Sequence, residues 1–342
     1  LKAGFPDKLY EDQGAVISDR AEVFAKANVL LQIRAVGTNP ETDSSDIGAL
    51  KEGQIVIGLI DALTNVDAVK SLAASKVKSF ALELVPRITR AQAMDVLSSQ
   101  ANLAGYKAVL IAADSMPRIF PMMMTAAGTI TPARVLVIGA GVAGLQAIAT
   151  ANRLGSIVSA YDIRPAVKEQ VQSLGAKFVE LELETGEAED KGGYAKAMDE
   201  EFYKKQRELM AKVVAENDAV ISTAAIPGKK APILITEEMV AGMKPGSVIV
   251  DLAAESGGNC EATVPGETVD KDGVKIIGPV NVPSSVPYHA SQMYAKNISN
   301  LLLLMVKDEE LNIDLEDEIL KESLVTDGGN VVNDRVKESL SL

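Results

Sequence analysis

Short, continuously apolar runs rich in β-branched residues alternate with helical segments along most of this chain, and this alternation limits the fold more than any other feature. Strands that are apolar throughout are typical of a parallel sheet covered by helices on both faces. A length of 342 residues favours two domains over one. The sequence therefore predicts an α/β fold with two doubly wound parallel-sheet domains. The predicted strands are 30–36, 54–60, 78–84, 134–139, 156–162, 218–224, 247–253 and 274–278.

Two boundaries divide the predicted strands into domains. A long helical pattern over 91–115 and a proline-containing stretch over 120–133 separate the first three strands from the rest, so we place one boundary near Thr125. The chain becomes helical again over 288–307, and we expect that helix to pack on the first domain after a second crossing near Val286. The predicted domains are 1–124 together with 287–342, and 125–286.

The two ends of the chain carry weaker signals. The opening LKAG is similar to the last turn of a helix with Gly4 as its stop, so we expect an upstream strand and helix that this sequence lacks. The acidic segment 313–329, IDLEDEILKESLVTDGG, is weakly patterned and is predicted to lie at the surface.

A glycine-rich turn, GAGVAG, follows the strand at 134–139 and opens a helix. Gly139 permits a tight turn, Gly141 lets a pyrophosphate approach the backbone, and Gly144 lets the helix lie close to the strand. The next strand ends in Asp162, whose carboxylate can bind the adenosine ribose and repel a 2′-phosphate. We therefore predict Rossmann-like domains with a nucleotide cleft between them and NAD as the cofactor. The alternative is a glycine turn used only for packing.

Ligands of such sheets lie outside the carboxyl ends of the strands. The loops 224–232 and 253–259 are therefore expected to line the cofactor groove, although each could equally be an ordinary turn between a strand and a helix.

Charge and cysteine content exclude several classes of protein. A formal net charge of −13 without a basic cluster argues against nucleic-acid partners. One cysteine, Cys260, and one histidine, His289, cannot form an internal disulfide or an ordinary zinc site, so we predict no structural metal. The most apolar run, 300–306, is far shorter than the roughly 18 residues of a membrane span.

Candidate acid–base groups are scarce. Most dehydrogenases move a proton together with the hydride and need a general acid or base, but His289 is more simply a surface or capping residue. A lysine or tyrosine base stays open. A second nicotinamide ring as hydride acceptor would remove the need for any base, and catalysis would then be positioning alone.

The segment 84–106 could supply that positioning, because it leaves the carboxyl end of a predicted strand with a concentration of polar residues. Its candidate residues are Arg87, Arg90, Gln92, Asp95 and Ser98. The plainer interpretation is a capping box, with Thr89 as N-cap, Gln92 three residues later, and the charges merely solvated.

Several longer motifs resemble the NAD(H)-binding domain of proton-translocating NAD(P) transhydrogenase, from about Gln13 to near the end of the chain. The Arg-Gln-Asp loop at 86–109 is the most specific of them. The resemblance implies an oxidoreductase of the Re/Si-specific type, in which hydride passes between NAD(H) on this chain and NADP(H) on a partner domain while a membrane domain translocates protons. The motifs are PRITRAQAMDVLSSQANLAGYKAV, AAGTITPARVLVIGAGVAGLQAIATANRLG, DIRPAVKEQVQSLGAKF, GGYAKAMDEEF, PGKKAPILITEEMV and KPGSVIVDLAAESGGNC.

The resemblance also assigns roles to individual residues. In the first domain, Arg87, Gln92, Asp95 and Ser98 match the loop that holds the nicotinamide end and are the candidate catalytic residues. Tyr194 matches the aromatic residue of a mobile loop that closes over the nucleotide, where Gly192 and Gly193 would ease a hinge; an ordinary surface loop is the alternative. The residues that match nucleotide contacts are Val142, Asp162, Ile163, Arg164, Gly193, Gln206 and Ala225.

The resemblance further implies a soluble homodimer that is peripheral on a membrane, facing the bacterial cytoplasm or mitochondrial matrix. One alternative is a soluble alanine dehydrogenase of the same superfamily, but the lysine and histidine of that enzyme are replaced here by Gln32 and Leu59. Another is a non-catalytic nucleotide sensor that uses only the glycine turn and Asp162.

Overall fold

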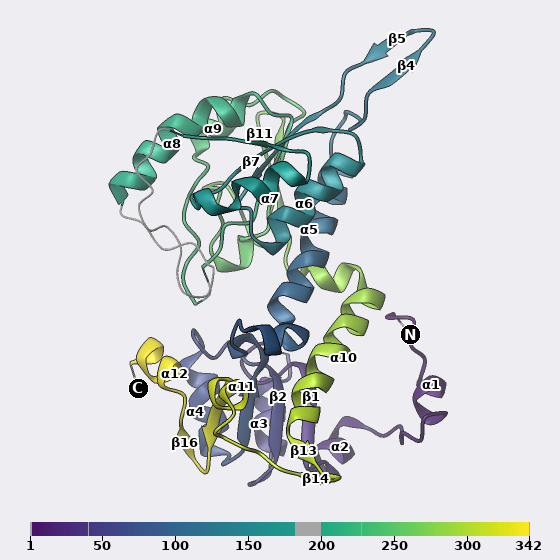
Figure 1. The fold of residues 1–342 in the computed structure, drawn as a ribbon, viewed down its shortest axis with the longest axis vertical. Helices are drawn as coiled ribbons and strands as arrows, with labels where there is room; N and C mark the ends of the chain where they lie inside the picture. The colour runs from purple at the N-terminus through teal and green to yellow at the C-terminus, as the bar shows by residue number, and fades with distance from the viewer. Residues whose placement is uncertain (1, 40, 182–199, 227, 342) are drawn as a thin grey trace. The chain divides into compact units, whose positions relative to one another are not determined.

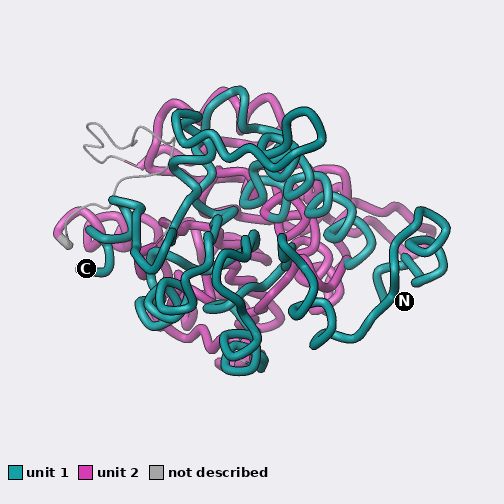
Figure 2. The backbone as a smooth tube through the Cα atoms, turned by 90° about the horizontal axis from the view of Figure 1, so that it is seen from below, with its two compact units in different colours: residues 1–100, 287–342 teal, residues 101–286 magenta. Residues whose placement is uncertain are grey.

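The computed structural model describes residues 2–39, 41–181, 200–226 and 228–341. Within it the chain forms two compact units, 1–100 with 287–342 (unit 1) and 101–286 (unit 2), coloured separately in Figure 2. The second division lies at Val286, where the sequence analysis placed it, but the first lies at Gln100 rather than near Thr125. The reason is that helix α5 (Val96–Ser115) contributes Val109 and Ala112 to the core of unit 2.

Unit 1 is built on a five-stranded sheet in the order β1-β2-β3-β15-β16. Strands β1 to β3 are parallel, as predicted, and coincide with the first three apolar runs. β15 pairs antiparallel with β3, and β16 pairs antiparallel with β15, so the sheet is mixed. The bounds are β1 Val29–Arg34, β2 Ile55–Leu59, β3 Lys78–Ala81, β15 Leu324–Asp327 and β16 Asn330–Val331.

Helices cover both faces of this sheet because neighbouring residues of β2 point to opposite sides. Val56 packs with residues of α4 and α12, whereas Ile55 and Ile57 pack with residues of α10 and α11. The helices of unit 1, besides the first turn of α5, are α1 Asp7–Glu11, α2 Arg20–Lys26, α3 Asp43–Ala49, α4 Val66–Ala74, α10 Pro287–Leu304, α11 Glu318–Ser323 and α12 Asp334–Leu340, with 3₁₀ turns η1 Leu82–Leu84 and η2 Thr89–Met94.

The prediction that 313–329 lies at the surface is wrong. Ile319 and Leu320 of α11 are fully buried, and Val325 of β15 is fully buried inside the sheet. The segment has few apolar residues between its acidic ones, so it shows no local pattern, but β3 offers it a pairing edge that is distant in sequence.

Unit 2 has a seven-stranded sheet in the order β11-β12-β10-β9-β6-β7-β8. All pairs are parallel except β11 with β12. The chain runs outward from β6 through β7 to β8 and then returns to β9, so the topological switch point lies between β6 and β9. The bounds are β6 Arg134–Ile138, β7 Ile157–Tyr161, β8 Lys177–Phe178, β9 Ala219–Ser222, β10 Val248–Asp251, β11 Thr268–Lys271 and β12 Val274–Ile277.

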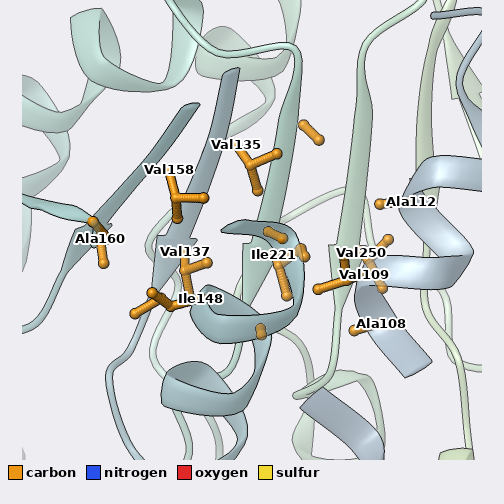
Figure 3. Close-up of a cluster of buried hydrophobic side chains, with 14 of the residues drawn as sticks. Ala108, Val109, Ala112, Val135, Val137, Ile148, Val158, Ala160, Ile221 and Val250 are labelled. Atoms are coloured by element: carbon orange, nitrogen blue, oxygen red, sulfur yellow. The ribbon is translucent and has the colours of Figure 1, made fainter. Parts of the chain in front are cut away.

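Each face of this sheet also carries its own core. Figure 3 shows one face, where Ile148 of α6 lies beside Val137 and Val109 of α5 lies near Val250. Residues of α8 and α9 pack against Ile249 on the other face. The helices of unit 2 besides α5 are α6 Val142–Arg153, α7 Lys168–Ser173, α8 Glu200–Ala215 and α9 Glu237–Ala241, with 3₁₀ turns η3 Pro165–Val167, η4 Ala254–Ser256 and η5 Val282–Ser285.

Two small hairpins complete the secondary structure. β13 (Val306–Lys307) pairs with β14 (Glu310–Leu311) in unit 1, and β4 (Met123–Thr125) pairs with β5 (Gly128–Ile130) in unit 2. The β4–β5 hairpin extends away from the rest of its unit (Figure 1). None of the helices in the described ranges combines the length and the hydropathy that a bilayer span requires. The two parallel-sheet, Rossmann-like units confirm the predicted fold class.

Candidate functional site

The glycine turn lies at the switch point of the unit 2 sheet, where β6 and β9 end. Gly139 has a φ of +92°, and a Cβ there would lie 2.8 Å from Thr223 Oγ1, so only glycine fits. Thr223 Oγ1 donates to the Gly139 carbonyl at 3.0 Å and ties the end of β9 to the turn. Ala225 follows two residues later and is exposed at this crevice.

The start of α6 is packed tightly against the turn. A Cβ on Gly144 would lie 1.8 Å from the Gly139 carbonyl oxygen, whereas a Cβ on Gly141 would meet nothing within 4 Å. The space at Gly141 is therefore open, and it adjoins the N-terminus of α6, which begins at Val142. Backbone N–H groups and the helix dipole favour an anion at such a place, so the pyrophosphate of a dinucleotide fits here.

Asp162, which follows β7, is buried and bonded to the turn and to Arg164. Its Oδ2 accepts a hydrogen bond from the Ala140 N–H at 2.7 Å. Its two oxygens also accept from the backbone N–H, Nε and Nη2 of Arg164 at 2.8–2.9 Å. Asp162 thus fixes the shape of the glycine turn, a role that the sequence analysis did not foresee, and the guanidinium of Arg164 balances its charge.

Gln206 and Ile163 lie behind this region. Gln206, on α8, is almost fully buried and donates through Nε2 to Tyr161 Oη at 2.7 Å. Its Oε1 is buried without a hydrogen-bond partner, so the side chain can still accept a bond from a ligand hydroxyl. Burial raises the pKa of Tyr161 to about 12, which keeps the phenol a neutral group beside Gln206. Ile163 is half-buried against the core on the α8 face. Gly193 and Tyr194 lie outside the described residues.

The two loops expected to line the groove are joined by a buried polar network. Asp251, at the end of β10, is fully buried and accepts five hydrogen bonds, among them those from Ser222 Oγ at 2.9 Å and Thr263 Oγ1 at 2.7 Å. Asn259, also fully buried, donates to the carbonyls of Ala224 and Pro232 and accepts from the Ala224 N–H. One amide side chain therefore connects 224–232 with 253–259 at the carboxyl edge of the sheet.

In unit 1, three of the four candidate catalytic side chains form one hydrogen-bonded chain. Arg87 Nη2 donates to Ser98 Oγ at 3.1 Å, and Ser98 Oγ donates to Asp95 Oδ2 at 2.6 Å. Arg87 Nε lies 3.8 Å from the same carboxylate oxygen. Gln92 lies exposed in the preceding η2 turn. The arrangement presents amide, guanidinium and hydroxyl groups that fit the carboxamide and ribose of a nicotinamide nucleotide.

The capping interpretation of Thr89 is wrong. Ile88 precedes η2, and no side chain caps it. Asp95 instead accepts from the Ser98 N–H at 2.8 Å and takes the capping position at the start of α5. The helix predicted over 91–115 therefore begins as a 3₁₀ turn and becomes α-helical only from Val96.

Other groups noted in the sequence lie apart from this chemistry. His289 is exposed at the start of α10 with its ring 5.2 Å from that of Tyr288. Cys260 is buried in unit 2. Gln32 and Leu59 lie on the neighbouring strands β1 and β2, and Gln32 Nε2 is 3.4 Å from Asp46 Oδ2. In the part of the chain that the structure describes, no three His, Cys, Asp or Glu side chains gather as a metal site would require.

Comparison with known proteins matches both units to one family. Residues 1–104 match the model described as alanine dehydrogenase/PNT, N-terminal domain, and residues 108–334 match alanine dehydrogenase/PNT, C-terminal domain. The chain is 51% identical over 335 residues to an NAD(P) transhydrogenase subunit alpha chain of Rhodospirillum rubrum, covering 97% of this chain and 87% of that protein.

A solved structure agrees with this match. The crystal structure of transhydrogenase from Sinorhizobium meliloti superposes with a TM-score of 0.85 at 47% identity, covering 96% of this chain and 88% of that chain. The alanine dehydrogenase of Mycolicibacterium smegmatis is more distant, at 25% identity over 345 residues, with 98% of this chain and 85% of that enzyme covered.

Proposed function

Because the chain belongs to the alanine dehydrogenase/PNT family, we propose that it is the NAD(H)-binding component of a proton-translocating NAD(P) transhydrogenase. In this proposal, hydride passes between NADH on this chain and NADP⁺ on a separate partner domain. A membrane domain couples the transfer to proton movement, and the chain turns over only together with its NADP(H)-binding partner.

The observation that carries the proposal is the polar chain Arg87–Ser98–Asp95 with exposed Gln92 beside it. When bound, the nicotinamide ring supplies the hydride-carrying carbon. The protein side chains have only to hold the ring in place, since a carbon-to-carbon transfer releases no proton. Gln92 and Arg87 can hydrogen-bond the carboxamide and ribose, while Asp95 and Ser98 fix the direction of the Arg87 guanidinium.

Unit 2 would hold the adenosine and phosphate end. The open space at Gly141 beside the start of α6 suits the pyrophosphate, and the unpartnered Oε1 of Gln206 suits a hydroxyl donor. The carboxylate of Asp162 favours a ribose with a free 2′-hydroxyl, which makes NAD(H) the expected cofactor of this chain. Val142, Ile163 and Ala225 complete this proposed contact set, as do Gly193 and Tyr194.

The alternative, an alanine dehydrogenase, needs a proton acceptor for the amino acid. Gln32 and Leu59 occupy the places where such groups were expected, and neither side chain titrates. His289 is exposed on α10 and paired with Tyr288 rather than placed on those strands. The residues of this chain therefore favour hydride transfer without acid–base catalysis.

The assembly proposed with this function is a homodimer that is peripheral on a membrane, facing the bacterial cytoplasm or mitochondrial matrix. Support comes from the names of the relatives, which are subunits of a larger enzyme. Nucleic acid is not expected as a partner, because the net charge of −13 repels phosphate backbones.

The test is hydride transfer from NADH to a nicotinamide acceptor analogue, with this protein alone and then mixed with an NADP(H)-binding domain from a transhydrogenase. We expect turnover only in the mixture and its loss in Gln92→Asn, because the shorter side chain withdraws the amide by about one methylene. Gln172→Asn, an exposed glutamine on α7, is the matched control and should leave turnover intact. A silent mixture that still binds NADH would refute the transhydrogenase assignment, and turnover of alanine by the protein alone would favour the alternative.

A further inference from the structure

The η2 turn that carries Gln92 has few hydrogen bonds of its own. The Ala91 N–H donates to the Ile88 carbonyl at 3.0 Å, and the Asp95 N–H donates to the Gln92 carbonyl at 3.3 Å. A 3₁₀ turn has poorer hydrogen-bond geometry than an α-helix and needs support from outside. In unit 1 that support comes from two sites far away in sequence, one on each side of Gln92.

The first support is an ion pair between Arg90 and Asp317. Arg90 Nη1 donates to Asp317 Oδ2 at 2.6 Å, and Nη2 donates to Oδ1 at 2.9 Å. Such a two-pronged pair fixes the guanidinium plane as well as its position. Asp317 is itself held, since its Oδ1 accepts from the Ile319 N–H at 2.8 Å and caps α11. Ile319 is fully buried, so the anchor of Arg90 stands on the core of unit 1.

The second support is a pair of amides on α10 that hold one carbonyl. Asn297 Nδ2 and Asn300 Nδ2 donate to the Ala93 carbonyl at 2.9 and 3.0 Å. The two asparagines are three residues apart and so share one face of the helix. Asn297 is buried, and its Oδ1 accepts from Ser99 Oγ at 2.7 Å, which links the same amide to α5.

These contacts leave Gln92 as an exposed residue between two fixed points, Arg90 and Ala93. From this geometry we infer that Asp317, Asn297 and Asn300 are positioning residues for hydride transfer, acting through the backbone of η2 on Gln92. The inference rests on the proposed function. Its physical reason is that hydride transfer depends steeply on placement, and a shift of about 1 Å in a positioning group can lower a rate by roughly a hundredfold.

Asp317→Asn tests the first support with little disturbance elsewhere. Asparagine still caps α11, because it is as good an N-cap as aspartate. It places an NH₂ group, or at best one neutral oxygen, where Arg90 now meets two carboxylate oxygens. Asp327→Asn is the matched control, because it removes the partner of Lys78 in the same unit without touching η2.

Two measurements decide the outcome. Hydrogen exchange of the nucleotide-free protein should speed up at 89–95 in Asp317→Asn and stay unchanged there in Asp327→Asn. In the mixture with the NADP(H)-binding domain, kcat of Asp317→Asn should fall roughly tenfold while the Kd for NADH changes less than about twofold. Arg90→Gln should have the same effect, and the double variant should be no worse than either single variant, because both changes remove one pair. Asn300→Ala should lower kcat in the same way through the second support.

Wild-type hydrogen exchange and wild-type kcat in Asp317→Asn would overturn the inference while leaving the proposed function intact. Faster exchange at 89–95 without any fall in kcat would also overturn it, since η2 would then be supported for stability alone. An absence of turnover in the wild-type mixture is a different result, because it would refute the proposed function itself.

Discussion

Two alanine substitutions in the glycine turn should separate folding from nucleotide binding. Gly144→Ala places a Cβ 1.8 Å from the Gly139 carbonyl oxygen, and both groups are held by backbone. Ordinary contact begins at 3.4 Å, so α6 must retreat by about 1.6 Å or the turn must open. Overpacking of this kind destabilises a protein by about 1–3 kcal/mol, and the displacement also moves the N–H groups at the start of α6.

Gly141→Ala is the opposite case. Its φ of −76° and ψ of −166° suit any residue, and a Cβ there meets nothing within 4 Å. The stiffer unfolded chain contributes about 0.4–1 kcal/mol of stability, and the weaker capping preference of alanine offsets part of it. The free energy of unfolding should therefore change by less than about 1 kcal/mol. The new methyl group nevertheless occupies the space assigned to the pyrophosphate, so the Kd for NADH should rise at least about tenfold, or ~1.4 kcal/mol.

Urea titrations and calorimetric titrations with NADH measure the two quantities side by side. The reasoning predicts that Gly144→Ala lowers the free energy of unfolding and that Gly141→Ala does not, while both weaken NADH binding. If Gly141→Ala binds NADH as the wild type does, the open space is not where the phosphates approach. If Gly144→Ala is as stable as the wild type, the close contact between α6 and the turn does not constrain the fold.

The other predictions concern buried polar groups. Burial raises the pKa of the Cys260 thiol to about 11, so at pH 8 the native protein should resist alkylation and react only when unfolded in urea, as mass spectrometry would count. Because this pKa lies above the ordinary 9.0, Cys260 favours the folded state at neutral pH, and that contribution should be lost between about pH 9 and 11, with a smaller loss in Cys260→Ala. Asp162→Ala leaves the Ala140 N–H without its acceptor, so it should lower the free energy of unfolding by about 1–3 kcal/mol and weaken NADH binding in titrations; unchanged binding would contradict the assigned role. Burial alone would raise the pKa of Asp46, but its hydrogen bonds with Arg20 outweigh burial and lower that pKa, so the pair contributes stability above the ordinary pKa of 3.8 that is lost on acidification; Arg20→Gln should flatten this acid dependence in thermal melts, and an unaltered profile would count against it.

The strands and the nucleotide turn were accessible to sequence analysis because their signals are local. β6, β9 and β10 are buried on both faces, so every residue of each must be apolar or small, and such a run is visible without knowing its partners. In the glycine turn, the need for Gly139 and Gly144 comes from contacts within a few residues or with the next strand. The β4–β5 hairpin, by contrast, was missed because its residues are exposed and carry no buried pattern.

The candidate catalytic loop shows where local reasoning ends. Sequence placed Arg87, Gln92, Asp95 and Ser98 at the start of a helix, but it assigned the capping role to Thr89, whereas the structure gives it to Asp95. A capping motif is ambiguous when several polar residues follow one another, because the chain itself decides which of them adopts the extended backbone that precedes the first turn.

The sequence by itself determined the α/β class, the order of the apolar strands and the glycine turn that follows β6. Only the tertiary structure decided that the acidic tail joins the sheet through β15, and that Asp317 and Asn297 hold the turn around Gln92. The physical reason is sequence distance. Periodicity and turn chemistry act over a few residues and leave a pattern, whereas the Arg90–Asp317 pair joins residues 227 positions apart and depends on how the chain closes on itself.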